Sequence, residues 1–257
     1  LAAMELPGQY DGRAEPLVDT HVLIDCFDEQ LLVLQSLRLP KRVTIRCSDQ
    51  TERRFLVKGG EDLRLDQRVQ QLMGLMNSVL DASAPCAARG LRMRTYAVAP
   101  LNPNVGLLEW MDGTDTLMSF MRKAALGNAD PREVEAEKQN FAKADGTFGN
   151  AYSDKVFKGA SSAQKVKSYK TAINEPNARE RSEERLAKAQ AVCPPNMLGR
   201  SIAREATSAE RYLTMRSTFA SSLAALTIAQ YLLGIGDRHL DNFMIEPATG
   251  RAIAIDF

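Results

Sequence analysis

The sequence predicts an α+β protein, and two patterns along the chain support this prediction. The first 110 residues alternate short apolar runs with turn residues, as β-strands do, and they include one stretch with helical spacing. The remainder is polar and helix-prone up to residue 211, and a long apolar helix and two short strands follow. We therefore predict two domains, a β-rich N-terminal lobe over 1–110 and a mostly helical C-terminal lobe over 111–257.

Composition excludes several classes of protein. The chain has 257 residues, 44% of them apolar and 25% charged, which is typical of a globular protein rather than a disordered one. The 33 basic and 32 acidic residues leave a net charge of +1, so no global basic field would attract nucleic acid or a membrane. Four separated cysteines and two histidines argue against a structural zinc site and favour a reduced compartment.

Six strands and one helix are predicted in the first 110 residues. The strands are His21–Ile24, Leu31–Leu34, Arg42–Cys47, Phe55–Lys58, Thr95–Pro100 and Val105–Trp110. Asp62–Leu80 is predicted as an amphipathic helix because its apolar residues recur at intervals of three and four. These residues are Val69, Leu72, Met73, Met76 and Leu80.

The segment Arg122–Arg211 has a different character. It contains 17 basic and 12 acidic residues, which predicts solvated helices and loops rather than core. The lysines between Lys155 and Lys170 are compatible with phosphate binding, but a plain solvated face explains them more simply.

An apolar helix is predicted next, over Tyr212–Gly236. Its charge-free part, Ser217–Gly236, is about as long as a bilayer span. However, it contains serine, threonine and glutamine residues and leads directly into charged residues, which favours a buried helix in a globular core. Two strands, Phe243–Glu246 and Ala252–Asp256, complete the chain.

The strongest pattern for chemistry lies in this last part. Asp237-Arg238-His239 is followed by Asn242, five positions after Asp237, and a hairpin then leads to Asp256. In phosphoryl transfer, one carboxylate orients the attacking hydroxyl, while an amide oxygen and a second carboxylate hold Mg²⁺ against the phosphates. The simpler alternative is a helix end capped by Gly236, with Arg238 and His239 complementing the helix dipole.

A lysine far upstream favours the catalytic interpretation. Lys58 ends an apolar strand, where its ammonium can point at nucleotide phosphates, and Glu61 and Asp66 follow as carboxylates that can hold it. The chain contains neither G-x-x-x-x-G-K-[ST] nor G-x-G-x-x-G. Ordinary P-loop NTPases, dinucleotide enzymes and typical protein kinases are therefore disfavoured.

Two of these segments resemble the phosphoinositide 3-kinase-related protein kinases. They are Lys58-Gly-Gly-Glu-Asp-Leu-Arg and Gly234-Ile-Gly-Asp-Arg-His-Leu-Asp-Asn-Phe. The similarity runs from about Glu5 to Phe257 and is weakest between Arg122 and Met197. It implies a two-lobed, phosphoinositide 3-/4-kinase-like catalytic domain with ATP between the lobes. It also implies a fragment truncated after the Asp-Phe of the metal-binding motif, which we expect to be poorly active by itself.

The resemblance further assigns roles to individual residues. The catalytic residues would be Asp237 as acid/base, His239 near the phosphates and Lys58 on the phosphates, and the metal ligands would be Asn242 and Asp256. The nucleotide would be bound by the Ser36–Lys41 loop over the phosphates, by Asp66 and Tyr96 in the inner pocket, and by Glu109, Trp110 and Met111 in the hinge. Glu109 and Met111 would offer backbone groups to adenine, and Trp110 would pack on the ring. The implied cofactors are ATP and Mg²⁺, with Mn²⁺ as the alternative.

This sequence departs from the family pattern at two positions. Leu65 stands where the family usually has glutamine, and Asp241 stands where a neutral polar residue is usual. Neither departure removes a proposed ligand, but Asp241 adds a negative charge beside the site.

The implied activity is transfer of the ATP γ-phosphoryl group to serine and threonine hydroxyls of proteins. Flanking segments that begin at Pro7, Ser36 and Arg216 resemble one member of the family. This resemblance implies a nuclear protein that acts in the DNA-damage response, in double-strand-break repair by non-homologous end joining. The implied partners are protein substrates and, through regions outside this chain, the Ku heterodimer and DNA ends; no membrane partner is expected. A lipid kinase of the same superfamily and a non-catalytic scaffold with a decayed kinase fold remain as alternatives.

Overall fold

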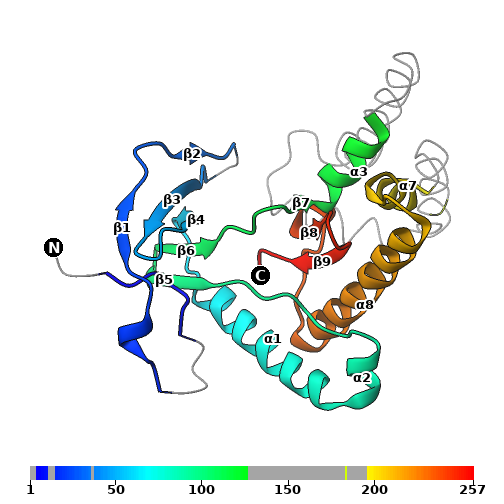
Figure 1. Ribbon diagram of the computed structural model, residues 1–257, viewed down its shortest axis with the longest axis horizontal. Helices are drawn as coiled ribbons and strands as arrows, with labels where there is room; N and C mark the ends of the chain where they lie inside the picture. Colours follow the sequence, from blue (N-terminus) through cyan, green and yellow to red (C-terminus); the bar gives the residue numbers. More distant parts are fainter. Residues whose placement is uncertain (1–3, 11–14, 36–37, 127–182, 184–195) are drawn as a thin grey trace, which may run out of the picture. The chain divides into compact units, whose positions relative to one another are not determined.

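The computed structural model describes residues 4–10, 15–35, 38–126, 183 and 196–257 (Figure 1). The chain divides into two compact units, residues 1–118 with 205–257, and residues 119–204. The described residues form helices and antiparallel sheets, which confirms the predicted α+β class. The two-lobed arrangement and the domain boundary after residue 110 stay predictions.

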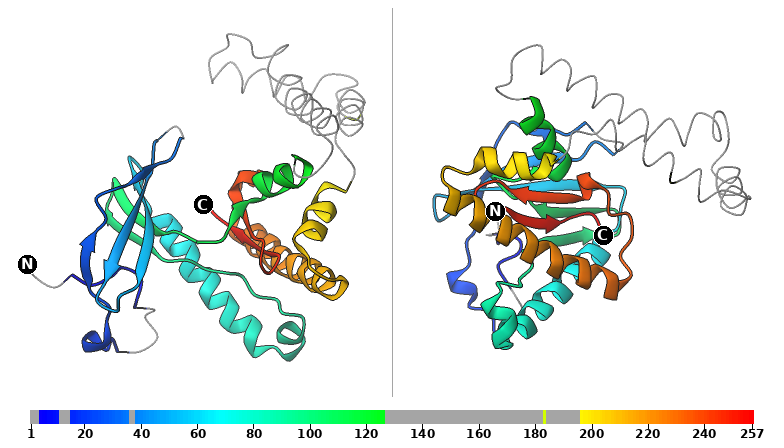
Figure 2. Two further views of the ribbon diagram at one scale, coloured as in Figure 1. Left: turned by 45° about the horizontal axis from the view of Figure 1, so that its top comes forward. Right: turned by 90° about the vertical axis from the view of Figure 1, so that its right-hand side faces the viewer.

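The first sheet belongs to the larger unit and contains six antiparallel strands in the order β1-β3-β4-β6-β5, with β2 also paired to β3 (Figure 2). The strands are β1 (Ile24–Phe27), β2 (Leu32–Val33), β3 (Lys41–Cys47), β4 (Glu52–Gly59), β5 (Val98–Asn102) and β6 (Val105–Glu109). The predicted strand Arg42–Cys47 is confirmed by β3, where the alternate residues Ile45 and Cys47 are buried with Leu6 and Phe55 in one hydrophobic cluster.

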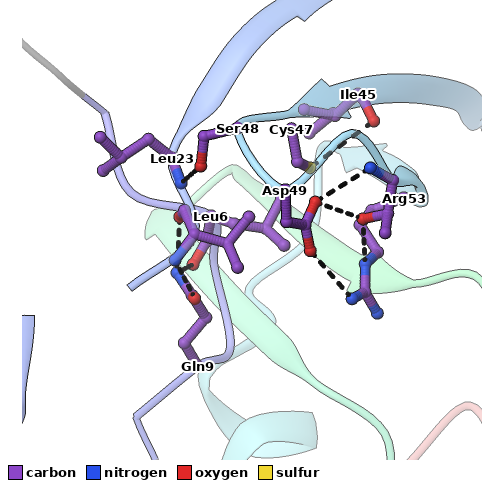
Figure 3. Close-up of polar contacts among 10 residues, drawn as sticks. Leu6, Gln9, Leu23, Ile45, Cys47, Ser48, Asp49 and Arg53 are labelled. Carbon is purple, nitrogen blue, oxygen red and sulfur yellow. Dashed lines mark hydrogen bonds and ion pairs between the residues drawn. The ribbon is translucent and has the colours of Figure 1, made fainter. Parts of the chain in front are cut away.

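The segment before β1 is held by side-chain hydrogen bonds in addition to a short stretch of backbone pairing (Figure 3). Gln9 Nε2 donates to the carbonyls of Leu6 and Val22, and Gln9 Oε1 accepts the Val22 N–H at 2.6 Å. The Leu23 N–H donates to Ser48 Oγ at 2.9 Å. Backbone pairing here is limited to one antiparallel bridge, between Glu5 and Leu23, with hydrogen bonds from the Leu6 N–H to the Val22 carbonyl and from the Ile24 N–H to the Met4 carbonyl. The predicted strand His21–Ile24 is therefore wrong in position, and β1 begins at its last residue.

Helix α1 (Arg64–Ala82) confirms the predicted helix, and the short helix α2 (Ala84–Ala88) follows it. The buried face of α1 contains Val69 and Met73 together with three polar residues, Asp66, Gln70 and Asn77. Leu72 was expected on this face but is 43% exposed. The buried face of α1 was predicted in the wrong place because the prediction used only the spacing of apolar residues and ignored these polar ones.

The buried polar residues of α1 bond to the extended segment that precedes β5. Asn77 donates to the Met93 carbonyl at 2.7 Å and accepts the Met93 N–H at 2.9 Å. Gln70 Oε1 accepts the Tyr96 N–H at 3.1 Å. Because the helix satisfies these backbone groups, β5 begins at Val98 and not at Thr95 as predicted.

The second sheet, also in the larger unit, has the order β7-β8-β9. Its antiparallel strands are β7 (Asp115–Thr116), β8 (Phe243–Glu246) and β9 (Arg251–Ala254). Helix α8 (Ala209–Leu233) packs against β9 (Figure 1). A Cβ at Gly250, in the β8–β9 turn, would lie 2.5 Å from the Met215 carbonyl oxygen, so the turn and the helix approach each other closely.

The two ends of α8 differ from the predicted ones. Ser208 Oγ caps its first turn by accepting the Arg211 N–H at 3.2 Å. Gly234, with φ of 66°, caps its last turn. The simpler alternative of a cap at Gly236 is therefore wrong, because the left-handed residue that ends this helix comes two positions earlier.

Within the described ranges, no helix is long and apolar enough to cross a membrane. The side chains that α8 buries include Met215, Phe219 and Leu226. The expectation of a buried helix for Ser217–Gly236 holds for one face only, because Ile228, Tyr231 and Leu232 are exposed.

The described part of the smaller unit comes from α3 (Leu117–Leu126) and α7 (Met197–Glu205). Arg204 Nη1 donates to the Lys123 carbonyl at 2.8 Å, and Phe120 and Ile202 are buried. Most of the predicted polar region Arg122–Arg211, including Lys155–Lys170, lies outside the described residues. The 3₁₀ turns η1 (Val18–Thr20) and η2 (Leu240–Asn242) complete the assignment.

Candidate active site

Lys58 lies near the end of β4, where it pairs with Gly106 of β6. Its side chain is only 14% exposed, and its ammonium forms ion pairs with Asp256 and, at 3.6 Å, with Glu61. Burial by itself would lower the pKa of Lys58, but the hydrogen bond and charge of Asp256, with the charges of Glu61 and Asp66, outweigh it and raise the pKa. Lys58 therefore remains a cation inside the site.

The segment after α8 turns through Asp237 into η2 and β8. Asp237 has φ of 54°, a left-handed conformation that is uncommon for a residue other than glycine. Asn242 is only 7% exposed, and its Nδ2 donates to the Asp237 backbone carbonyl at 2.8 Å. The backbone carbonyl of Asn242 accepts the Ile255 N–H at 3.1 Å. His239 Nδ1 accepts the Asp241 N–H at 3.2 Å. These hydrogen bonds join Asp237, Asn242 and the strand that leads to Asp256.

Arg238 connects the same two segments more extensively. Its guanidinium donates to the carbonyls of Gly236 at 2.7 Å, Ile255 at 2.8 Å and Asp256, and it lies 5.4 Å from the centre of the Phe257 ring. Asp256 has φ of 59°, so the clamped backbone is also left-handed. From the sequence, Arg238 was given only a role at the end of a helix. The one feature of the sequence that pointed to its contacts with the Asp256 segment was its position between Asp237 and His239.

A first cavity of about 660 Å³ contains most of the predicted nucleotide-binding residues. The predicted residues that line it are Lys58, Tyr96, Glu109, Trp110, Met111 and Asp256. Its apolar walls include Leu56, Leu108, Met244 and Ile255. The cavity therefore combines an apolar interior with charged groups contributed by β4 and by the segment after β9.

A second cavity of about 650 Å³ contains the predicted catalytic residues. Asp66, Asp237, His239 and Asn242 line it, and Lys58, Glu61 and Asp256 line both cavities. Lys58 and Asp256 thus lie where the two cavities meet.

Two predicted residues are not brought into this arrangement. Ser36 lies outside the described residues, and Lys41, exposed at the start of β3, does not line either cavity as described. Arg38, from the same predicted loop, lines the first cavity and donates to the Gly60 carbonyl at 2.7 Å and to Glu61 at 3.1 Å. The sequence pattern placed the loop at the site but did not single out Arg38.

Asp66 lies near Lys58 without forming an ion pair to it within the described part of the chain. It accepts the Phe257 N–H at a long 3.4 Å. Burial, with the neighbouring charge of Asp256, raises the pKa of the Asp66 carboxyl. The expectation that Asp66 holds Lys58 in place is therefore limited to a charge effect, whereas Glu61 forms the expected contact.

The hinge segment has its backbone fixed by neighbouring groups. The Glu109 N–H donates to the Ala97 carbonyl at 2.8 Å, and the Trp110 N–H donates to the Arg54 carbonyl at 2.9 Å. The Met111 carbonyl accepts Thr114 Oγ1 at 2.7 Å. The Arg42 guanidinium lies 5.3 Å from the centre of the Trp110 ring, which adds a cation–π contact.

Tyr96 places a buried hydroxyl at the wall of the first cavity. The residue is 5% exposed, and within the described part of the chain its hydroxyl has no hydrogen-bond partner of normal geometry. Burial, followed by the charges of Asp66 and Asp256, raises the pKa of the phenol. Tyr96 therefore presents a neutral donor and acceptor to the cavity.

Asn242 and Asp256 supply the donor chemistry that a hard divalent cation needs. Because Asn242 Nδ2 is engaged by the Asp237 carbonyl, Oδ1 is the amide atom oriented as an acceptor. No cluster of three or more histidine, cysteine or acidic ligands occurs among the described residues. Two protein oxygens without such a cluster fit Mg²⁺, which usually takes its other ligands from phosphates and water.

Comparison with known proteins identifies the family to which this arrangement belongs. The family described as "Phosphatidylinositol 3- and 4-kinase" matches residues 52–257. The chain belongs to this family. Membership in the phosphatidylinositol 3- and 4-kinase family confirms the resemblance drawn from the Lys58 and Asp237 segments, and it identifies a kinase, for which ATP and a divalent metal ion are the expected cofactors.

Individual relatives are similar over almost the whole chain. The DNA-dependent protein kinase catalytic subunits of Gallus gallus and Xenopus laevis are 42% and 41% identical over 99% of this chain. The serine/threonine-protein kinase TOR of Arabidopsis thaliana is 32% identical over the same share. The matched region covers only 6% of the first two proteins and 9% of the third.

Proposed function

We propose that the chain is the catalytic region of a serine/threonine protein kinase that transfers the ATP γ-phosphoryl group to protein hydroxyls. The observation that supports this most directly is the ion pair between Lys58 and Asp256, residues 198 positions apart. It joins the proposed phosphate-binding cation to the proposed metal-binding carboxylate where the two cavities meet.

The first cavity would bind the nucleotide. Leu56, Leu108 and Ile255 offer apolar walls for adenine. Since the Met111 carbonyl already accepts Thr114, the proposed contacts of the base are the Met111 N–H and the Glu109 carbonyl, with Trp110 packed on the ring. Tyr96 would line the inner end, whereas Asp66, predicted for the same pocket, lines the second cavity, and the Ser36–Lys41 loop would cover the phosphates.

The second cavity would perform the chemistry. The Lys58 ammonium would bind phosphate oxygens, Asp237 would orient the acceptor hydroxyl and receive its proton, and His239 would lie beside the transferred phosphate. Asn242 and Asp256 would hold Mg²⁺, which neutralises negative charge on the phosphates when bound. Arg238 would keep the Asp256 backbone in place.

The two-lobed arrangement is part of this proposal, with a hinge at residues 109–111 between 1–110 and 111–257. The family match supports it, as does a site that draws residues from both sides of residue 110.

The names and identities of the relatives support the finer function. Five relatives named DNA-dependent protein kinase catalytic subunit are 39–42% identical, compared with 28–33% for three TOR kinases. We therefore propose a nuclear protein that acts in double-strand-break repair by non-homologous end joining. Its partners would be protein substrates and, through regions outside this chain, the Ku heterodimer and DNA ends.

A lipid kinase is the second candidate, because the family description names phosphatidylinositol kinases. A direct test uses the full-length protein with radiolabelled ATP and Mg²⁺, offered either a serine- and threonine-containing peptide or phosphatidylinositol vesicles. We expect label in the peptide and none in lipid, and Asp237→Asn should abolish the labelling. Transfer to lipid alone would replace the proposal with the second candidate, and transfer to neither would favour a scaffold.

A further inference from the structure

Two consecutive residues of η2 face different cavities. Asn242 lines the second cavity with Asp237 and His239, whereas Asp241 lines the first, with the hinge residues. In a 3₁₀ turn, successive side chains are separated by about 120° around the axis, which explains the divergence. The extra carboxylate of this sequence is therefore directed to the nucleotide cavity and not to the cavity of the catalytic residues.

Local contacts fix the position of Asp241. Thr116 Oγ1 donates to Asp241 Oδ1 at 3.2 Å, and the Asp241 N–H donates to His239 at 3.2 Å. Thr116 belongs to β7, which pairs with β8 directly after η2. Asp241 is thus connected to the hinge side of the cavity through Thr116 and to the metal side through its neighbour Asn242.

The chemistry of a carboxylate restricts what it can contact in this cavity. An ionised carboxylate only accepts hydrogen bonds, with room for about four, so the bond from Thr116 leaves acceptor capacity. It would repel phosphates, and the cation nearest to them, Lys58, already pairs with Asp256 and Glu61. Between the base at the hinge and the phosphates at Lys58, a nucleotide presents a sugar whose hydroxyls are donors.

We propose that Asp241 is a specificity-determining residue that accepts a hydrogen bond from a ribose hydroxyl of the bound nucleotide. The inference rests on the proposed function and adds to it a way of distinguishing ribonucleotides from deoxynucleotides. Thr116 orients the carboxylate through its own hydrogen bond, and both residues line the same wall.

The test compares sugars within each protein. In the full-length kinase, KM is measured for ATP, 2′-deoxy-ATP and 3′-deoxy-ATP with wild type, Asp241→Asn and Asp241→Ala. A hydrogen bond to a charged acceptor predicts that wild type has a KM about tenfold higher for at least one deoxy analogue. Asp241→Asn retains a neutral acceptor and should reduce this preference, whereas Asp241→Ala should abolish it.

A metal-free measurement separates the sugar from the metal. Adenosine, 2′-deoxyadenosine and 3′-deoxyadenosine are compared as inhibitors of ATP binding, because they contain no phosphate. The same preference for adenosine is expected in wild type and not in Asp241→Ala. The matched control is Asp112→Asn, which removes a carboxylate that pairs with Arg54 at 2.7 Å and does not line the described cavities.

Each outcome decides the inference. A ribose preference that survives Asp241→Ala would overturn it, and so would wild type that does not distinguish the sugars. A variant that changes the Mg²⁺ requirement but not the sugar preference would also overturn it and would assign the carboxylate to the metal. A wild-type protein that neither binds nor uses ATP would instead contradict the proposed function.

Discussion

At the scale of single residues, Lys58 shows how burial and charge together determine a role. It is a cation with 14% of its side chain exposed, beside the carboxylates of Glu61, Asp66 and Asp256. An exposed lysine on a strand would contribute little, because surface ion pairs are worth about 0–1 kcal/mol. The position of Lys58 between the cavities is what makes it a candidate for binding phosphate.

We predict that Lys58→Ala lowers phosphoryl transfer in the full-length protein by about 10²–10³-fold. Lys58→Arg should also fail although it keeps the charge, because a planar guanidinium does not replace a compact ammonium. Arg46→Ala is the control, since Arg46 is an exposed cation of the same sheet outside the described cavities. Normal turnover by Lys58→Ala in a steady-state assay would remove Lys58 from the site.

Arg238 supports a second prediction. Arg238→Lys keeps a positive charge but loses the fork that reaches three carbonyls, so Asp256 should be held less firmly. We expect kcat to fall and the Mg²⁺ concentration for half-maximal activity to rise, each by about 10- to 100-fold. Arg54→Lys, which alters an ion pair at the hinge, should leave the Mg²⁺ requirement unchanged. An unaltered Mg²⁺ titration for Arg238→Lys would argue against this positioning role.

The sequence predicted some of these residues and missed others for a physical reason. Lys58, Asp237, Asn242 and Asp256 are recognisable because their side-chain chemistry and spacing belong to phosphoryl transfer. The role of Arg238 is not recognisable, because its partners are backbone carbonyls, which every residue has. Only the fold brings those carbonyls to one guanidinium.

At the scale of elements, α1 combines packing with hydrogen bonding on one face. Apolar spacing predicted the helix, but it placed Leu72 on the buried face, where the structure has Gln70 and Asn77. Those amides replace strand partners for the segment before β5, so the start of that strand was also misplaced. The spacing of apolar residues predicts which side chains pack in a core. It does not reveal buried polar side chains whose hydrogen bonds go to the backbone.

The buried carboxylate of α1 predicts a pH dependence of stability. Burial raises the pKa of Asp66 above 3.8, its ordinary value. As the pH rises from 3.8 through the folded-state pKa, the unfolded chain loses this proton first, so the charged group destabilises the folded state increasingly. Asp66→Asn should therefore raise the free energy of unfolding above that window and leave it unchanged below, in urea titrations at several pH values.

Asp62 provides the matched control for this prediction. It lies two residues before α1, and its hydrogen bonds with Arg64 lower the pKa of its carboxyl. The pH dependence of stability is then opposite to that of Asp66. The ionised Asp62 carboxylate stabilises the fold above its unfolded-state pKa, and this stabilisation is lost as the pH falls through the folded-state pKa. Asp62→Asn should therefore destabilise at neutral pH. Destabilisation by Asp66→Asn at neutral pH would contradict the prediction.

At the scale of the whole molecule, the site depends on groups that no single element provides. Asn242 and Asp256, the proposed metal ligands, offer two oxygens, and no cluster of three or more histidine, cysteine or acidic residues occurs among the described residues. We therefore predict that Mg²⁺ binds appreciably only with nucleotide, which supplies phosphate oxygens.

Family membership was predictable from two short motifs, whereas the arrangement of two cavities around Lys58 and Asp256 required the folded chain.

Thermal unfolding of the full-length protein measures the dependence of Mg²⁺ binding on nucleotide. Mg²⁺ alone should not change the Tm, whereas Mg²⁺ with ATP should raise it, with about 2.7 kcal/mol of stabilisation at one hundred times the Kd. Asn242→Ala should remove the part of the shift that needs Mg²⁺ and keep the part due to ATP. A clear rise in Tm with Mg²⁺ alone would show a site that the protein completes by itself.

The contact between Lys58 and Asp256 also has a consequence for the order of folding. Strands β3 and β4 are joined by a short turn, so their pairing closes a small loop and can form early. The ion pair instead closes a loop of 198 residues, and its entropic cost grows with the logarithm of that length. During synthesis from the N-terminus, the strands of the first sheet leave the ribosome long before Asp256 does. A newly made chain should therefore acquire its first sheet before the proposed phosphate-binding site.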